Sequence, residues 1–304
     1  MGDVLHALPA VASLKQSFPH CHLTWVIEQK WADLLTGNAF VDQVLTVDRT
    51  SLSSLLDLRR RLRKNPFDFA VDFQGLLKSA LIAASARPNK IYGFSRSQVR
   101  ERLASLFYSH TAKAKSEHVV DRNLELAQAA GATNVVRAFQ VPPGHPEGDL
   151  PPGDFVLASP LAGWKSKEWP LENYAALAKR LREELAVALV LNVPTRDLEV
   201  PGAILHVSRL PGLIHATRIA TAVVGLDSGP MHLAAALGKP GVALFGPTDP
   251  ARNGPYGDSI DVLRSAEAVT SYKRRLTIDP SMRAITVDSV FDSLKSRMCC
   301  PTNP

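Results

Sequence analysis

Residues 223–250, VVGLDSGPMHLAAALGKPGVALFGPTDP, restrict the fold of this chain more than any other stretch. An apolar strand runs into a turn at 227–229, and Pro230 suits the first position of a helix. Gly238 suits the position just past that helix, where a left-handed backbone is common, and the second strand GVALF follows. The segment is therefore a complete strand–helix–strand unit, the repeating element of parallel α/β sheets.

The same alternation extends along the whole chain of 304 residues. After an opening helix, apolar and β-branched runs typical of strands alternate with amphipathic helical runs. Strands are expected at 22–29, 41–47, 67–73, 90–94, 155–160, 187–193, 221–226 and 241–245. Helices are expected at 51–64, 76–86, 98–108, 117–130, 170–185, 210–220, 231–237 and 287–298. This order predicts an α/β protein with mainly parallel sheets.

A stretch dense in Pro and Gly, VPPGHPEGDLPPGD at 141–154, interrupts the alternation and predicts an extended connector. We therefore expect two Rossmann-like domains, at residues 1–145 and 152–304. The final helix, at 287–298, is expected to pack back on the N-terminal domain. The tail CCPTNP after it is expected to be a loose end.

Composition restricts the classes of partner and compartment. With 45% hydrophobic and 21% charged residues the chain is an ordinary globular protein. The formal charge of +6 favours an anionic partner such as a nucleotide, a phosphorylated lipid surface or nucleic acid. No basic stripe interleaved with aromatic residues supports nucleic acid, so that partner is not expected. The three cysteines suit a reducing cytosol, and no apolar run reaches the length of a membrane span.

The polar cluster at 227–232 is the first candidate site. In open α/β sheets ligands bind beyond the carboxyl ends of strands, which is where Asp227, Ser228, Gly229 and His232 lie. The free N–H groups at the helix start suit a phosphate. The alternative is a helix cap with a histidine packed beneath it. A cap explains one polar residue, whereas the cluster and the polar GPTDP after the next strand favour binding.

Two other polar runs have simpler explanations. His20, Cys21 and His22 lie together but have no spaced partner for a zinc site, so no metal is expected. The run RRRLRK at 59–64 is typical of a solvated helix face and also suits anionic lipid headgroups.

Several segments in the same order resemble the family 9 glycosyltransferases, the ADP-heptose:lipopolysaccharide heptosyltransferases. They are MGDVLHALPAV, VDFQGLLKSALIA, VRERLASLFYS, EHVVDRNLELA, KSKEWPLENYAALAKRL and LDSGPMHLAAALGKPGVALFGPTDP. The likeness covers most of the chain. The stretch LASLFY is more similar to type I than to type II heptosyltransferases.

The resemblance implies a GT-B architecture, with two Rossmann-like domains facing a cleft. It also implies inverting transfer of heptose without a metal or other cofactor, with ADP-heptose as the donor. Asp3 matches the aspartate taken as general base, for which the alternative is a helix cap. Lys167 matches a lysine near the donor phosphates, with Lys165 as a competitor. Asp227, Ser228, Gly229 and His232 match the donor site of the C-terminal domain.

For the acceptor, a Kdo-bearing lipid A core, the N-terminal domain carries the matching residues Asp72, Lys78, Arg100, His118 and Arg122. Arginine suits carboxylates because its planar fork binds them bidentately. Such an enzyme is expected to be a cytoplasmic monomer in peripheral contact with the anionic inner membrane.

Two departures from the family pattern keep alternatives open. Relatives begin with a short apolar strand before the Gly-Asp loop, and without that strand two neighbouring strands stay unpaired and Asp3 lies on a frayed terminus. Arg196 lies where an acidic ribose contact is expected, with Asp197 and Glu199 nearby. The alternatives are a nucleotide-sugar-binding protein without transferase activity and a family 9 transferase for another sugar, similar to type II.

Overall fold

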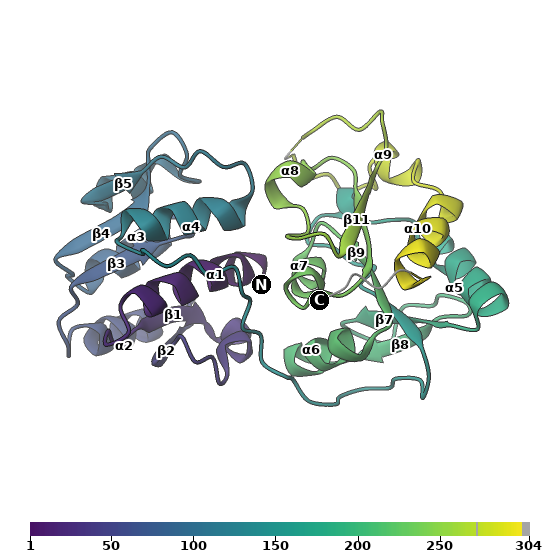
Figure 1. The fold of residues 1–304 in the computed structure, drawn as a ribbon, viewed down its shortest axis with the longest axis horizontal. Helices are drawn as coiled ribbons and strands as arrows, with labels where there is room; N and C mark the ends of the chain where they lie inside the picture. Colours follow the sequence, from purple (N-terminus) through teal and green to yellow (C-terminus); the bar gives the residue numbers. More distant parts are fainter. Residues whose placement is uncertain (272, 300–304) are drawn as a thin grey trace. The chain divides into compact units, whose positions relative to one another are not determined.

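The computed structural model describes residues 1–271 and 273–299, so Cys300 and the rest of the predicted loose tail lie outside the described residues. The chain divides into two compact units (Figure 1). The N-terminal unit is Asp3–Pro142, and the C-terminal unit is Pro143–Pro304 together with Met1–Gly2. The N-terminal unit ends at Pro142, three residues before the domain end at 145 expected from the sequence, because Gly144 and His145 pack on Pro211 of the C-terminal unit.

The C-terminal unit is built on a six-stranded parallel sheet with the order β11-β10-β9-β6-β7-β8. Its strands are β6 (Phe155–Ala158), β7 (Ala188–Val193), β8 (Ile204–Val207), β9 (Ala222–Leu226), β10 (Gly241–Phe245) and β11 (Ile260–Arg264). Its helices are η3 (Lys165–Lys167), α5 (Leu171–Leu185), α6 (Leu210–Ile219), α7 (Gly229–Ala236), α8 (Pro250–Asn253), α9 (Pro280–Arg283) and α10 (Val287–Cys299). The residues of β6, β9 and β10 are all buried, as expected for strands covered on both faces.

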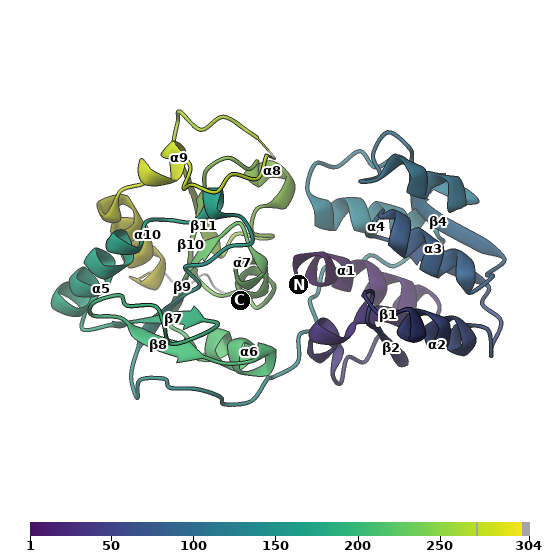
Figure 2. The ribbon, with the colours of Figure 1, turned by 180° about the vertical axis from the view of Figure 1, so that it is seen from behind.

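The N-terminal unit carries its strands in two separate parallel sheets, β1-β2 and β3-β4-β5. These strands are β1 (Thr24–Glu28), β2 (Gln43–Val47), β3 (Phe69–Asp72), β4 (Lys90–Phe94) and β5 (His110–Ala112). The helices are α1 (Gly2–Ser17), η1 (Gln29–Leu35), α2 (Leu52–Leu62), α3 (Leu77–Ser85), η2 (Arg102–Phe107) and α4 (Val119–Ala129), seen from both sides in Figures 1 and 2.

The two units share one pattern of strand order. Numbered along each unit, the C-terminal sheet has the order 3-2-1-4-5-6 typical of doubly wound folds. The N-terminal sheets match positions 3-2 and 4-5-6, and no strand of the described residues occupies position 1. The edges of β1 and β3 that would flank it are unpaired, and most residues of both strands stay half-exposed. The two unpaired neighbours expected from the sequence are therefore confirmed.

The final helix, α10, buries Val290, Phe291 and Leu294 in the core of the C-terminal unit, because α5 and β10 offer it an apolar surface there. Two other expectations are wrong. The helix expected at 98–108 is a loop followed by the short 3₁₀ helix η2. Asp3 is not on a frayed terminus, because it lies in the first turn of α1, where two side chains of the N-terminal unit bind it.

Candidate functional site

The order of the C-terminal sheet marks a candidate ligand crevice. The chain runs outward through β6, β7 and β8, then returns to the other side of β6 for β9, β10 and β11. The order reverses between β6 and β9, and the carboxyl ends of strands at such a switch point form the usual ligand crevice of α/β sheets. Asp227 follows β9 there, and Lys167 belongs to the segment after β6.

Lys167 and Asp227 form a buried ion pair, with Nζ 2.5 Å from Oδ2. His232 lies on the other carboxylate oxygen, with Nε2 3.9 Å from Oδ1. All three side chains are at least 86% buried, being 14%, 7% and 8% exposed. A buried charge pair is retained only where geometry and hydrogen bonds compensate its desolvation, so this cluster fixes one ammonium group at the switch point. The structure thus brings together three residues that the sequence singled out.

The start of α7 adds backbone donors beside this cluster. Ser228 precedes the helix, and its buried hydroxyl has no partner within the described residues. Gly229 is the first helical residue, one position earlier than the Pro230 start expected from the sequence. A Cβ at Gly225 would lie 2.6 Å from Cβ of Met231, so glycine lets α7 pack directly on β9. The N-terminal end of α7 therefore presents free N–H groups and a hydroxyl, which suit an anion.

Two further residues lie near these elements: Trp164, which sequence reasoning missed, and Thr248, which belongs to the polar GPTDP segment that the sequence pointed to. The Trp164 ring lies under two cations, Lys167 Nζ at 4.3 Å and Arg274 Cζ at 5.4 Å from its centroid. Thr248 follows β10, is 1% exposed, and its hydroxyl has no partner within the described residues. The signal for Thr248 was its place just past a strand, whereas the contact of Trp164 with Lys167 exists only in three dimensions.

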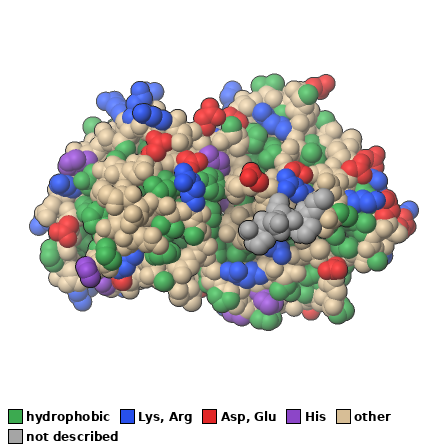
Figure 3. All heavy atoms as spheres, viewed as in Figure 1, with side chains coloured by type: hydrophobic (Ala, Val, Ile, Leu, Met, Phe, Trp, Pro, Cys, Tyr) green, Lys and Arg blue, Asp and Glu red, His purple; other side chains and the backbone are tan. Residues whose placement is uncertain are grey.

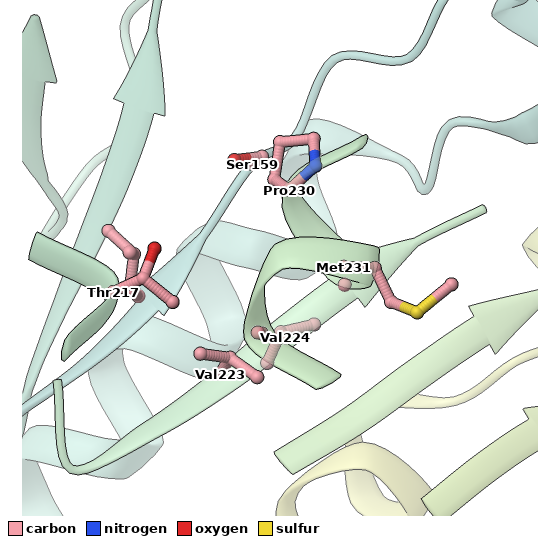
Figure 4. Close-up of a pocket in the computed structure, with 9 residues that line it drawn as sticks. Ser159, Thr217, Val223, Val224, Pro230 and Met231 are labelled. Carbon is pink, nitrogen blue, oxygen red and sulfur yellow. The ribbon is translucent and has the colours of Figure 1, made fainter. Parts of the chain in front are cut away.

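A small pocket lies behind the first turn of α7 (Figure 4). Its cavity volume is about 10 Å³, far below the range of about 300–1,000 Å³ typical of ligand pockets. The lining comes from β6, α6, β9 and α7 and is mostly apolar: Leu157, Ser159, Thr217, Val223, Val224, Gly225, Pro230, Met231 and Ala234. This pocket is too small for a nucleotide.

In the N-terminal unit, Asp3 and Arg100 form a bidentate ion pair. Arg100 donates from Nη1 and Nη2 to the two carboxylate oxygens of Asp3, at 2.9 and 2.6 Å. Gln74, which follows β3, donates a third hydrogen bond at 3.4 Å. The sequence predicted Asp3 and Arg100 as separate site residues, 97 positions apart, and missed Gln74, although its place after a strand was a usable signal.

These contacts determine the protonation of Asp3. Burial acts to raise the pKa of Asp3, but the hydrogen bonds and charge of Arg100, together with the hydrogen bond from Gln74, outweigh burial. The pKa of Asp3 is therefore held below its usual value. Asp3 is ionised at neutral pH and its proton affinity is low as long as Arg100 stays paired with it.

Asp72 supports the loop that carries Gln74. It is 5% exposed and accepts four hydrogen bonds, from the amides of Gln74 and Gly75 and from the hydroxyls of Ser79 and Tyr108. The hydrogen bond from Tyr108 is short, at 2.6 Å. Burial, as the larger cause, and then the negative charge of Asp72 raise the pKa of Tyr108 well above its usual value. Asp72, predicted as an acceptor ligand, therefore uses both carboxylate oxygens inside the fold.

The other predicted acceptor residues lie on separate helices of the same unit. Lys78 is exposed on α3. His118 caps α4 by accepting from the Val120 amide, and its ring contacts His6, one turn from Asp3 on α1. Arg122 lies 5.4 Å from the centre of the Phe94 ring.

Three features of the described residues bear on other classes of function. Among residues 1–271 and 273–299 no group of three His, Cys, Asp or Glu side chains is arranged to hold a metal ion. Over the same ranges, no helix is long and apolar enough to cross a bilayer. On the face drawn in Figure 3, Lys and Arg side chains are interspersed with Asp and Glu and form no continuous basic stripe of the kind that nucleic acid selects.

Comparison with known proteins gives consistent matches over most of the chain. A family model described as "Glycosyltransferase family 9 (heptosyltransferase)" matches residues 55–280. Lipopolysaccharide heptosyltransferase 1 of Escherichia coli (strain K12) is 30% identical over 296 residues, which cover 87% of this chain and 91% of that protein. The solved structure of E. coli heptosyltransferase WaaC with ADP is similar with a TM-score of 0.77 and 25% identity, covering 97% of this chain and 96% of that one. The WaaC structure with ADP-2-deoxy-2-fluoro heptose has a TM-score of 0.76, with the same identity and coverage.

Proposed function

The chain belongs to glycosyltransferase family 9, and from that premise we propose that it transfers heptose from ADP-heptose to the inner core of lipopolysaccharide. The likeness to the WaaC structures confirms the α/β GT-B fold expected from the sequence. The observation that supports the donor assignment best is the buried Lys167–Asp227 pair at the switch point of the C-terminal sheet.

The C-terminal unit is proposed to hold the donor. Lys167 keeps two further N–H donors for the diphosphate while Asp227 holds its third, and Asp227 in turn lies against His232. The amide of Gly229 and the hydroxyl of Ser228 add hydrogen bonds to the same anion. As ADP leaves, negative charge grows on its terminal phosphate, and fixed positive groups lower the barrier because they need no reorganisation. In this proposal Lys167 and α7 supply that charge without a metal.

The N-terminal unit is proposed to hold the acceptor, with Asp3 as general base. The acceptor hydroxyl oxygen attacks the anomeric carbon, the bond from that carbon to the diphosphate oxygen breaks, and the hydroxyl proton passes to Asp3. Attack opposite the leaving group inverts the anomeric centre. Arg100 binds a carboxylate of the acceptor bidentately, which frees Asp3 from the ion pair and increases its proton affinity.

The remaining acceptor residues have unequal roles in this proposal. Lys78, His118 and Arg122 bind the anionic groups of a Kdo-bearing lipid A core, whereas Asp72 acts only through the loop of Gln74 that it supports. The protein is proposed to work as a monomer on the cytoplasmic face of the inner membrane, in peripheral contact with anionic lipid.

A matched pair of lysines tests the donor assignment. Lys167→Met is expected to lower kcat with ADP-heptose by about a hundredfold, the size of effect seen when one charge-stabilising donor is removed. Lys165→Met is the control, because Lys165 is bound to Glu168 at 2.5 Å and lies in the same 3₁₀ helix. Equal activity of the two variants would overturn the assignment. Binding of ADP with no transfer by the wild-type chain would favour the alternative of a nucleotide-sugar-binding protein.

Whether the chain prefers the type I acceptor is tested by product analysis. Type I activity places the heptose on Kdo, whereas the alternative, a type II-like transfer, requires an acceptor that already carries heptose. Transfer only to the second acceptor would overturn the type I proposal and leave the donor site intact. Activity retained in EDTA tests metal independence.

A further inference from the structure

Three consecutive cations, Lys273, Arg274 and Arg275, form an exposed basic run between β11 and α9 of the C-terminal unit. The proposed donor site does not use this run. One of its members nevertheless lies beside a residue of that site. The guanidinium carbon of Arg274 is 5.4 Å from the centre of the Trp164 ring, and Lys167 Nζ is 4.3 Å from the same centre. One aromatic ring therefore brings two cations from distant segments together.

The segment that carries Arg274 is anchored at the carboxyl edge of the C-terminal sheet. At one end, the Ser271 amide donates to the carbonyl of Pro247, just after β10, at 2.7 Å. At the other end, the Asp279 amide donates to the carbonyl of Ser166, in η3 after β6, at 3.3 Å. Parallel strands end at one edge of their sheet, and ligands bind beyond that edge at the switch point. The segment of Arg274 is therefore held at the edge of the candidate crevice.

The charge of Arg274 is not compensated as the charges of its neighbours are. Lys167 is paired with Asp227 at 2.5 Å, so these two side chains together carry no net charge. Arg275 has a counter-ion of its own, with Nη1 3.6 Å from Oδ2 of Asp279. Within residues 1–271 and 273–299, no carboxylate is paired with Arg274. Of the two cations on the ring, Arg274 therefore supplies the net positive charge.

We propose that Arg274, held on the Trp164 ring, binds the diphosphate of the donor together with Lys167. The planar guanidinium can bind two phosphate oxygens at once, whereas the ammonium group of Lys167 acts as a point charge. The ring attracts each cation, but the two cations repel each other, and an anion bound to both offsets that repulsion. Trp164 is then a positioning residue, because it acts through the two cations that it holds.

This inference rests on the proposed function, because it names the donor group that meets the segment after β11. A nucleoside diphosphate carries more than one negative charge, which the neutral Lys167–Asp227 pair alone does not balance. The same diphosphate remains in ADP after the sugar has left. Arg274 therefore contributes to the affinity for ADP as well as for the donor, and ADP binding alone reports on it.

Calorimetric titration of the full chain with ADP, without acceptor, tests the role of Arg274. Arg274→Gln should weaken ADP binding about tenfold, the size expected for the loss of one charge-assisted contact. Inorganic pyrophosphate, measured by its displacement of ADP, should lose affinity by a similar factor. Displacement by adenosine, which has no phosphate, should require the same adenosine affinity in both chains. The matched control is Arg275→Gln, which removes the same charge from a side chain already paired with Asp279 and should leave ADP binding unchanged.

Further variants separate binding from folding. Arg274 is exposed, so Arg274→Gln should leave the midpoint of urea unfolding unchanged. Arg274→Lys should recover only part of the lost affinity, because it keeps the charge but not the planar fork. Trp164→Leu should also weaken ADP binding, since it removes the ring that holds both cations, and Trp164→Phe should restore most of the affinity.

Three results would overturn the proposal: no binding of ADP or pyrophosphate by the wild-type chain, equal ADP affinity of Arg274→Gln and Arg275→Gln, and a loss of adenosine affinity as large as the loss for ADP. These results are distinguishable from failure of the proposed function. Heptose transfer by the wild-type chain with unchanged ADP affinity in Arg274→Gln would remove the role of Arg274 and leave the function. ADP binding that depends on Arg274, without any heptose transfer, would support that role and overturn the function.

Discussion

Replacing Arg100 by Gln should move the acid limb of the pH profile to higher pH. Asp3 must be ionised to accept a proton, and Arg100 is the main group that holds its pKa below the usual value. A carboxyl with a lowered pKa stays ionised as pH falls until the pH reaches that lowered pKa. Without Arg100 the pKa of Asp3 rises, so the variant loses the ionised form earlier on acidification.

The size of the effect follows from the exposure of the pair. The Arg100 and Asp3 side chains are 42% and 40% exposed, so solvent screens their attraction. Exposed ion pairs contribute about 0.2–1 kcal/mol, and the bidentate geometry places this one near the upper end. A difference of about 1 kcal/mol is about fivefold in an equilibrium constant. The ratio of kcat/KM in the variant to kcat/KM in wild type should therefore be about two- to fivefold lower on the acid limb than at pH 8.

The assay is ADP release with a detergent-dispersed acceptor, with kcat/KM measured from acid pH to pH 8. Arg96→Gln, an exposed arginine of the same loop, is the control, and Asp3→Asn identifies the background rate. Arg100→Gln should also raise KM for the acceptor, because it removes the proposed carboxylate contact. Coincident acid limbs in Arg100→Gln and wild type would refute the coupling. Full activity of Asp3→Asn would refute the base.

Three further variants test how the site is supported. Gly225→Ala should destabilise the C-terminal unit by about 1–3 kcal/mol in urea unfolding, because its Cβ would overlap Met231. Tyr108→Phe should lower the unfolding free energy by about 1–3 kcal/mol, since a buried carboxylate loses a donor, and an unchanged urea midpoint would contradict this. Asp227→Asn should weaken ADP binding in calorimetry and destabilise the fold, because it leaves Lys167 buried without its counter-ion.

Local signals in the sequence predicted the ends of α7 and the place of Asp227 in the fold. Pro230 and Gly238 place both ends of α7, and Gly238 does adopt a left-handed backbone, with φ of +64°. The rule that ligands lie past strand ends then identifies Asp227 without any alignment. Strands β8 and β11 were missed, because ILHV and IDVLR are short and carry weak patterns.

Contacts between distant residues could not be predicted from the sequence. The pairing of Asp3 with Arg100 joins positions 97 residues apart, and neither position carries a pattern that refers to the other. The family resemblance predicts Asp72 as an acceptor ligand, but its four hydrogen bonds depend on where Tyr108 and Ser79 lie in the fold. The packing of α10 depends on which apolar surface accepts it, which a helical period alone does not specify.

The divided sheet of the N-terminal unit has a consequence for how that unit opens. Ladder hydrogen bonds couple β1 with β2, and β3 with β4 and β5, but none couples β1 with β3. Strands joined by ladder hydrogen bonds tend to open together. The amide protons of β1–β2 and of β3–β5 are therefore expected to exchange with solvent as two groups, each with its own free energy of opening. The six strands of the C-terminal sheet should exchange as one. The loops that carry Gln74 and Arg100 follow β3 and β4, so the contacts that these two residues make with Asp3 depend on the stability of the second group.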